Sequence, residues 1–228
     1  MSKPRPPHIN QPGGPFRASG HEEVAGREVE LRRLADGVRR LAAATVTHRA
    51  SAEETTRLAD SVHAAADDLE RYCEGEPPLR YSGPPPDREV EPHDIFGYDP
   101  VLGLYNPLAL PVEMEYVDGR AIGRACFTTL YEGPPGCVHG AVLAAVFDQV
   151  FNVANILGGT AGPTVSLELN YKKPTPLHDD IVFEAWIEEL DERRVTSRGL
   201  VRHGDVVCVE SKGVFARLSK DRSLNLRG

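Results

Sequence analysis

The chain has 228 residues, of which 40% are hydrophobic and 26% are charged. This length allows one large domain, or a domain of about 130–150 residues with an appendage. The composition is that of an ordinary globular protein with a sizeable core. The net charge of -8 and the pI near 5.5 argue against nucleic acid as the main partner.

The N-terminal residues and the cysteines favour a cytoplasmic location. The N-terminal residues are polar and rich in proline and glycine, without the apolar stretch of a signal peptide. The scattered cysteines contain no C-x-x-C pair, so we expect reduced thiols and neither a disulfide framework nor a zinc site. The longest apolar segment carries Asp148 and several amides, which indicates a core helix and no membrane span.

The N-terminal third predicts a disordered tail at 1–20 and a helical hairpin at 21–75. Apolar residues recur at helical spacing in two runs: Leu31, Leu34, Val38 and Leu41, then Leu58, Val62, Ala65, Leu69 and Tyr72. Ser51 and Glu54 form the capping-box pattern that begins the second helix. We interpret the hairpin as a packing or oligomerisation element, with partner recruitment as the alternative.

Residues 76–103 are rich in proline, glycine and charge, which predicts a linker or a strap. The main domain is expected at 104–218, followed by a polar tail at 219–228. Alternating apolar residues predict six strands, at 112–117, 120–130, 164–173, 181–190, 195–202 and 206–218. A helical pattern predicts one long helix at 140–157, between the second and third strands. This order predicts an α+β fold in which a curved antiparallel sheet wraps around a central helix. Such a sheet leaves open edges, so we expect the chain to form homo-oligomers.

The central helix is apolar on nearly every side, yet Asp148 lies in its middle. A buried unpaired charge costs several kcal/mol, so such a residue is usually held by partners or retained for chemistry. The start of the helix, at Gly140, offers free N–H groups and the positive end of the helix dipole. Together these features suggest an active site; the alternative is that Asp148 is a polar residue satisfied by the backbone or Asn152.

Three linked motifs carry a resemblance to a known family. Residues 132–140 read E-G-P-P-G-x-x-H-G, Asp148 follows nine positions after His139, and residues 164–174 read T-x-x-L-x-x-x-Y-x-x-P. In this pattern the chain resembles the hotdog-fold thioesterases, in particular the phenylacetate-pathway (PaaI-type) group and its thioesterase-superfamily relatives. The resemblance covers about residues 104–218. It implies a hotdog fold, with the N-terminal hairpin outside the matched part.

The resemblance also implies roles for four residues. Gly140 corresponds to the glycine whose backbone N–H binds the thioester carbonyl, and Asp148 to the carboxylate that activates water or attacks directly. Thr164 corresponds to a hydroxyl residue near that carboxylate, although strict alternation along its strand places Thr164 on the polar face. His139 corresponds to the histidine that orders the loop. In this family the site lies between two subunits, so Gly140 of one chain would face Asp148 of the other.

The implied reaction is hydrolysis of an acyl-CoA by a dimer or a dimer of dimers, without metal or cofactor. We expect residues beside the site to bind substrate, with basic ones at strand ends meeting the CoA phosphates: Val138, Ala141, Asn170, Lys172, Lys173 and Arg217. Ala141 stands where the family more often has a second glycine. Two alternatives stay open: a hotdog module that binds acyl-CoA or another hydrophobic ligand without hydrolysis, and a dimerising scaffold whose N-terminal helices dock a partner.

Overall fold

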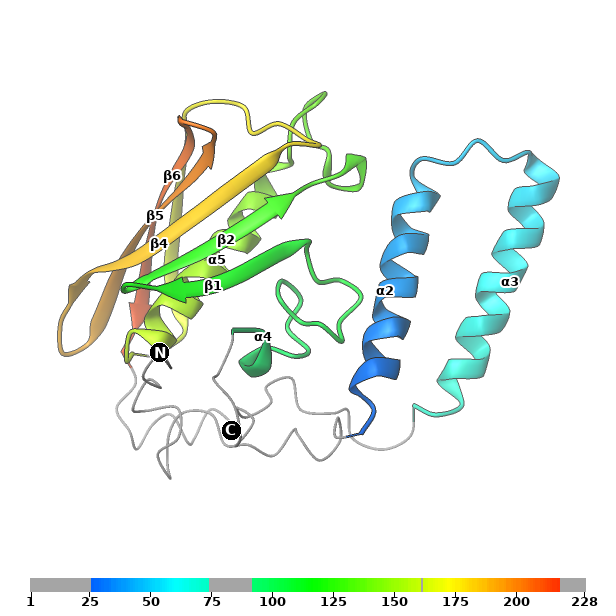
Figure 1. Ribbon diagram of the computed structural model, residues 1–228, viewed down its shortest axis with the longest axis horizontal. Helices are drawn as coiled ribbons and strands as arrows, with labels where there is room; N and C mark the ends of the chain where they lie inside the picture. The colour runs from blue at the N-terminus through cyan, green and yellow to red at the C-terminus, as the bar shows by residue number, and fades with distance from the viewer. Residues whose placement is uncertain (1–25, 74–91, 161, 218–228) are drawn as a thin grey trace.

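A computed structural model describes residues 26–73, 92–160 and 162–217 of the chain (Figure 1). The expected tails at 1–20 and 219–228, and most of the expected strap, lie outside the described residues. The described part contains four α-helices, one 3-10 helix and six strands. Their order is α2 (Glu28–Thr45), α3 (Ala52–Glu70), α4 (Pro92–Ile95), β1 (Val112–Val117), β2 (Arg120–Cys126), η1 (Thr129–Tyr131), α5 (Gly140–Leu157), β3 (Thr164–Tyr171), β4 (Asp180–Leu190), β5 (Arg194–His203) and β6 (Val206–Ala216).

The six strands form one antiparallel sheet in the order β1-β2-β4-β5-β6-β3. Asp118 and Gly119 join β1 to β2 with positive φ angles of 51° and 79°, as a tight type I′ hairpin turn requires. β3 follows α5 in the chain but pairs with β6, so it forms an edge of the sheet. The predicted α+β hotdog fold, with its curved antiparallel sheet, central helix and N-terminal helical hairpin, is confirmed (Figure 1).

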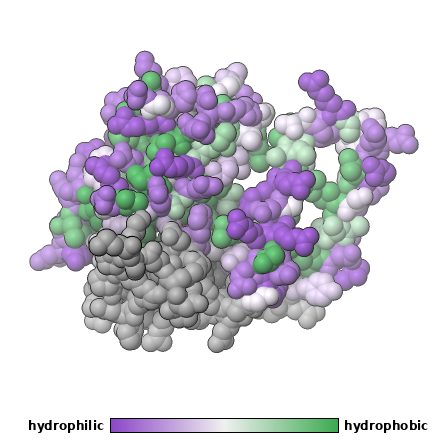
Figure 2. Space-filling view, viewed as in Figure 1, coloured by the Kyte–Doolittle hydropathy of each residue, from purple (hydrophilic) through white to green (hydrophobic). Residues whose placement is uncertain are grey.

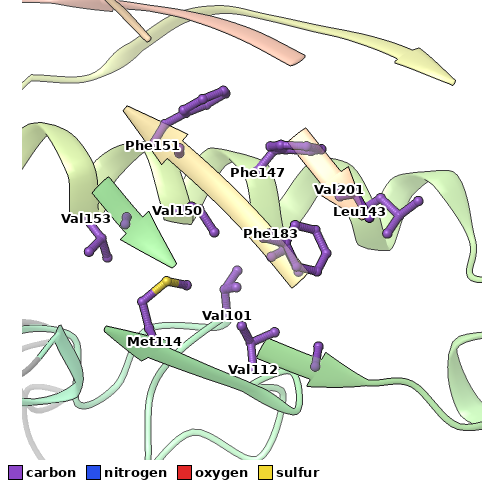
Figure 3. Packing of buried hydrophobic residues seen from close by; sticks show 14 of the residues in the cluster. Val101, Val112, Met114, Leu143, Phe147, Val150, Phe151, Val153, Phe183 and Val201 are labelled. Atoms are coloured by element: carbon purple, nitrogen blue, oxygen red, sulfur yellow. The ribbon is translucent and has the colours of Figure 1, made fainter. Parts of the chain in front are cut away.

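α5 packs its aromatic side against the sheet (Figure 3). Phe147 and Phe151 are fully buried, and the Phe147 ring meets that of Phe183 on β4 edge to face, with centroids 5.6 Å apart. Gly199 and Gly213 make room for this contact, because a Cβ atom at either position would come within 2.8 Å of the Phe147 or Phe151 ring. α5 has the length and hydropathy of a membrane span, but the sheet covers most of it, as in any core helix.

The packed core extends upstream of the expected domain start at residue 104. Phe96, Val101 and Leu102 are buried and belong to the same cluster as the α5 side chains. In Figure 3, Val101 lies with Met114 and Val112 of β1 beneath Val150 and Val153 of α5. These three residues, which the sequence placed in the strap, therefore belong to the packed core.

The N-terminal helices stand beside this core and barely touch it. Both bonds of the predicted capping box are present, from the Glu54 N–H to Ser51 Oγ at 3.2 Å and from the Ser51 N–H to Glu54 Oε2 at 3.0 Å. No α3 side chain is buried, and Ala35 is the buried residue of α2. Arg39 anchors α2: its Nη2 atom lies 3.0, 3.1 and 2.7 Å from the carbonyl oxygens of Gly103, Leu104 and Asn106.

Replacing Arg39 with Ala should detach the hairpin from the core. Three carbonyl groups would lose a charged donor, and a hydrogen bond to a charged group contributes about 1.5–3 kcal/mol. We expect hydrogen exchange within α2 to become about tenfold faster or more. The neighbouring exposed Arg40 is the matched control, and Arg40→Ala should leave the exchange rates unchanged. Equal rates in both variants would show that the carbonyl contacts do not hold the hairpin.

Candidate active site

The loop before α5 is a fixed turn held by its own motif residues. The Glu132 carboxylate accepts the Gly136 N–H at 2.7 Å, and the Gly133 N–H donates to the Cys137 carbonyl at 2.9 Å. The Val138 N–H donates to the Thr175 carbonyl at 2.9 Å, which ties the loop to the segment after β3. The E-G-P-P-G sequence therefore builds the entry to the helix, and Glu132 has a structural role that its motif position alone did not reveal.

His139 is the N-cap of α5 and orders the start of the helix. Its Nδ1 atom accepts the Ala141 N–H at 3.0 Å, and its own N–H donates to the Tyr131 carbonyl at 2.8 Å. Burial raises the pKa of Tyr131, and the positive charge of Arg39 opposes this shift. The contacts of His139 are those of a residue that fixes the loop, which is the role that the resemblance implies.

Gly140 begins α5 and leaves its N–H available. No described residue accepts a hydrogen bond from this N–H, and the helix dipole makes the position electropositive. The Gly140 carbonyl accepts the Tyr171 hydroxyl at 2.9 Å. A Cβ atom at Gly140 would lie 3.1 Å from the Tyr171 hydroxyl oxygen, so the tyrosine forms a wall beside the helix start. Sequence reasoning placed Tyr171 in a motif but not among the site residues.

Thr164 donates a hydrogen bond from its hydroxyl to Asp148 Oδ1 at 2.7 Å. The prediction that strict alternation places Thr164 on the polar face of its strand was wrong. β3 changes register against β6 between Thr164 and Ser166, and this irregularity reverses the side on which Thr164 lies. The structure thus brings together the carboxylate and the hydroxyl residue that the resemblance pairs.

Asp148 is half-buried, which corrects the prediction of a fully buried carboxylate. The sheet covers one side of α5 and leaves a strip along the other side incompletely covered. This strip is built of small and polar residues: Ala141, Ala144, Ala145, Asp148 and Asn152. Gln149, one position further along, is the deeply buried polar residue instead, with 5% exposure. In the described part of the chain, the second carboxylate oxygen of Asp148 has no hydrogen-bond donor.

Gly140 and Asp148 lie too far apart to act on one carbonyl group within a single chain. Eight residues of α-helix separate them, which corresponds to about 12 Å along the helix axis. β3 carries Thr164 at one end and Tyr171 at the other, and it is an edge strand whose Val165 is 57% exposed. The two groups therefore lie near opposite ends of an open edge of the sheet.

The expected substrate-binding residues lie in two places, around the start of α5 and at the end of β3. Val138 is buried and structural, whereas Ala141 is exposed at the start of α5 beside Gly140. Lys172 forms an exposed ion pair with Glu210 at 3.1 Å, and Lys173 follows it at the same strand end. Asn170 is exposed on β3 opposite Glu210.

Arg217 belongs to the other end of β3, which corrects its grouping with the two lysines. Its guanidinium donates to the Asp191 carbonyl at 3.0 Å, and the neighbouring Ala216 N–H bonds to Pro163, just before β3. The eight-residue strand spans about 25 Å. Arg217 and Lys173 of one chain therefore cannot contact the same phosphate. Among the described residues, no group of three His, Cys, Asp or Glu side chains is placed to hold a metal ion.

A solved crystal structure of the thioesterase superfamily protein RHA08564 superposes on this chain with a TM-score of 0.71. The two sequences are 34% identical, and the superposition covers 81% of this chain and 94% of the other. The chain belongs to the thioesterase superfamily. The thioesterase superfamily family model matches residues 135–210, a span that includes His139, Gly140, Asp148 and Thr164.

Among curated superfamily members, the chain is similar to two acyl-coenzyme A thioesterases. It is 30% identical over 89 residues to THEM5 of Homo sapiens, covering 38% of this chain and 36% of the relative. It is 30% identical over 94 residues to THEM4 of Bos taurus, covering 40% of this chain and 38% of the relative. The match thus spans little more than a third of the length of these relatives.

We expect the Thr164 hydroxyl to position Asp148 through its hydrogen bond, and the hydroxyl can be tested separately from the shape of the side chain. Thr164→Val removes the donor and keeps the volume, whereas Thr164→Ser keeps the donor. A hydrogen bond to a charged group contributes about 1.5–3 kcal/mol, so we expect kcat on a thioester substrate to fall about tenfold or more in the valine variant. The serine variant should restore most of this loss. A loss of the same size in both variants would assign the effect to packing at the strand entry.

Proposed function

We propose that this chain is an acyl-CoA thioesterase whose active site is shared by two copies. The observation that carries the proposal is the pairing of Thr164 with Asp148 at an open sheet edge, with the free Gly140 N–H at the far end of the same exposed helix strip. A dimer formed across this edge would bring Gly140 of one copy to Asp148 of the other. The curated relatives named acyl-coenzyme A thioesterases support CoA as the leaving group.

In the proposed reaction, Asp148 takes a proton from a water molecule, and the water oxygen bonds to the thioester carbonyl carbon. The partner copy's backbone N–H at the helix start donates to the carbonyl oxygen, which becomes an oxyanion in the tetrahedral intermediate. The oxyanion then re-forms the carbonyl group as the carbon–sulfur bond breaks, and Asp148 returns its proton to the leaving sulfur. The products are the carboxylic acid and the CoA thiol, and the Asp148 carboxylate is regenerated. Thr164 holds one Asp148 oxygen by its hydrogen bond, which leaves the other oxygen for the water.

The decisive experiment measures CoA thiol release from short, medium, long and aromatic acyl-CoAs. Release well above the uncatalysed rate on at least one class supports hydrolysis and identifies the preferred acyl group. Saturable binding of acyl-CoA without thiol release on any class would instead support a non-hydrolytic binding module. The exposed strip beside Asp148 is lined by alanine side chains, so the acyl group would lie against a smooth apolar surface.

Lys173 is the better candidate for a contact with the CoA phosphates. Lys172 is already paired with Glu210, whereas no described acidic residue forms an ion pair with Lys173. An exposed ion pair is worth about 0.2–1 kcal/mol, so Lys173→Ala should raise KM for acyl-CoA by about two- to fivefold. KM for an N-acetylcysteamine thioester, which has no phosphate, should not change. An equal change on both substrates would place Lys173 in folding or acyl binding.

A further inference from the structure

The N-terminal hairpin presents apolar residues that the rest of the described chain does not cover. α2 uses one face, with Ala35 and Arg39, to contact the core. Leu34, Val38 and Leu41 lie on a separate face, about a third of a turn away, and are 47%, 42% and 43% exposed. The contact with the core therefore does not account for this apolar stripe.

α3 carries a matching stripe and contributes no buried residue at all. Leu58, Val62 and Leu69 are 47%, 40% and 47% exposed, and Thr55 and Ala65 complete the alternating three- and four-residue spacing. This spacing is the a/d repeat of helices that pack along a seam. Figure 1 places α3 on the side of α2 that faces away from the sheet, so the sheet cannot cover the α3 stripe.

The two helices of the hairpin do not bury these stripes against each other, because the apolar side chains of both stripes stay 40–47% exposed in the described chain. An apolar helix face is buried only when a further layer packs on it, and bundles of helices reach this state with four members. Figure 2 shows apolar side chains on the hairpin, next to an opening between the helices. The hairpin has the sequence pattern of a bundle but only half of the helices that a bundle needs.

We propose that the hairpin is a homotypic interface: α2 and α3 of one copy pack on the hairpin of a second copy and form a four-helix bundle. The stripes themselves are free of charge. Helical spacing places Asp60 and Asp67 on the side of α3 opposite Val62, and it places Arg33 and Arg40 about a third of a turn from the α2 stripe. Among the described residues no ion pair joins α2 to α3; Arg39–Asp36 and Arg71–Asp68 are local pairs. An apolar contact between copies would therefore leave the charged side chains at its margin or in solvent.

The size of the hairpin fits such an interface. Two helices of this length offer a face about 27 Å long and about 20 Å wide. Specific protein interfaces bury roughly 800 Å² of accessible surface per partner, which is the same order as this face with its protruding side chains. The hairpin is therefore large enough for a stable contact between copies.

This interface is separate from the active-site edge. Arg39 attaches the hairpin to residues 103–106, just before β1, and β1 is the opposite edge of the sheet from β3. A chain can therefore pair with one copy through β3 and with another through its hairpin. The result is a dimer of dimers in which the hairpins join catalytic pairs.

The test compares molar masses of the full chain and two matched valine variants by light scattering. Val62→Asp places a charge in the α3 stripe, whereas Val29→Asp changes a 66% exposed valine on the other side of α2. We expect Val62→Asp to halve the mass and to keep the wild-type kcat per chain, and Val29→Asp to keep the wild-type mass. A change from tetramer to dimer preserves the proposed active-site pairing, whereas a change from dimer to monomer would support the hairpin interface and contradict that pairing. An unchanged mass in both variants overturns the inference.

A second measurement covers the case in which Val62→Asp unfolds the hairpin, which circular dichroism would reveal. In the wild-type chain, hydrogen exchange of residues 52–70 is followed at two protein concentrations about a hundredfold apart. Protection that rises with concentration supports the bundle between copies. Protection that is independent of concentration overturns it, either because α3 stays exposed or because another segment of the same chain covers the stripe.

Discussion

Replacing Asp148 with Asn should lower kcat for acyl-CoA hydrolysis by about 10²- to 10⁴-fold, the contribution of a well-placed general base. The amide has the same shape, and its oxygen still accepts the Thr164 hydroxyl, so the hydrogen bond that positions the side chain is retained. What the variant loses is the ability to take a proton from water. KM should change little, because the carboxylate does not hold the substrate in its ground state.

Two comparisons separate this chemical effect from a general loss of structure. The thermal unfolding temperature of Asp148→Asn should stay close to that of the wild type, since no buried ion pair is broken. Glu113→Gln makes the same chemical change on the exposed face of β1 and should keep the wild-type kcat. Wild-type turnover in Asp148→Asn would remove the general-base mechanism and would assign the proton transfer to another group.

The sequence predicts the main elements of this fold because their signals are local. The strand at 112–117 and the helix at 140–157 have the predicted bounds, since alternation and helical spacing depend only on neighbouring residues. The register irregularity in β3 has no such local signal. It depends on how β3 meets β6, and for this reason the strand pattern alone placed Thr164 on the wrong face.

The depth of Asp148 could not be predicted for a related reason. α5 is apolar on nearly all sides, so the sequence does not show which side the sheet covers. The structure assigns the sheet to the side of Phe147 and Phe151, buries Gln149, and leaves Asp148 on the incompletely covered strip. The motifs identified the site residues, whereas their exposure depends on tertiary packing.

Gly140→Pro should lower kcat by about 10²- to 10³-fold, because it removes an N–H that the mechanism assigns to the oxyanion. Proline is favoured at the first position of a helix, and His139 already has the extended conformation that a following proline requires, with φ of -62° and ψ of 135°. The helix should therefore still begin at the same residue. The substitution deletes one donor with little change to the backbone.

Gly140→Ala is the matched control for this variant. Its Cβ atom meets the Tyr171 hydroxyl at the same 3.1 Å, but the N–H is kept. If kcat falls little in the alanine variant and strongly in the proline variant, the effect belongs to the hydrogen-bond donor. Equal losses in the two variants would instead assign it to the crowding of Tyr171.

Mixing Gly140→Pro with Asp148→Asn tests whether the two groups act across copies. In a mixed dimer, the intact Gly140 of one chain meets the intact Asp148 of the other, which rebuilds one of the two symmetric sites. Random exchange of equal amounts should then restore about a quarter of the wild-type activity, because half of the dimers are mixed and each has one working site. Activity that stays at the level of the separate variants, after subunit exchange has been verified, would mean that the site lies within one chain. The distance of about 12 Å along α5 argues against that outcome, because no single carbonyl group can contact both residues of one helix.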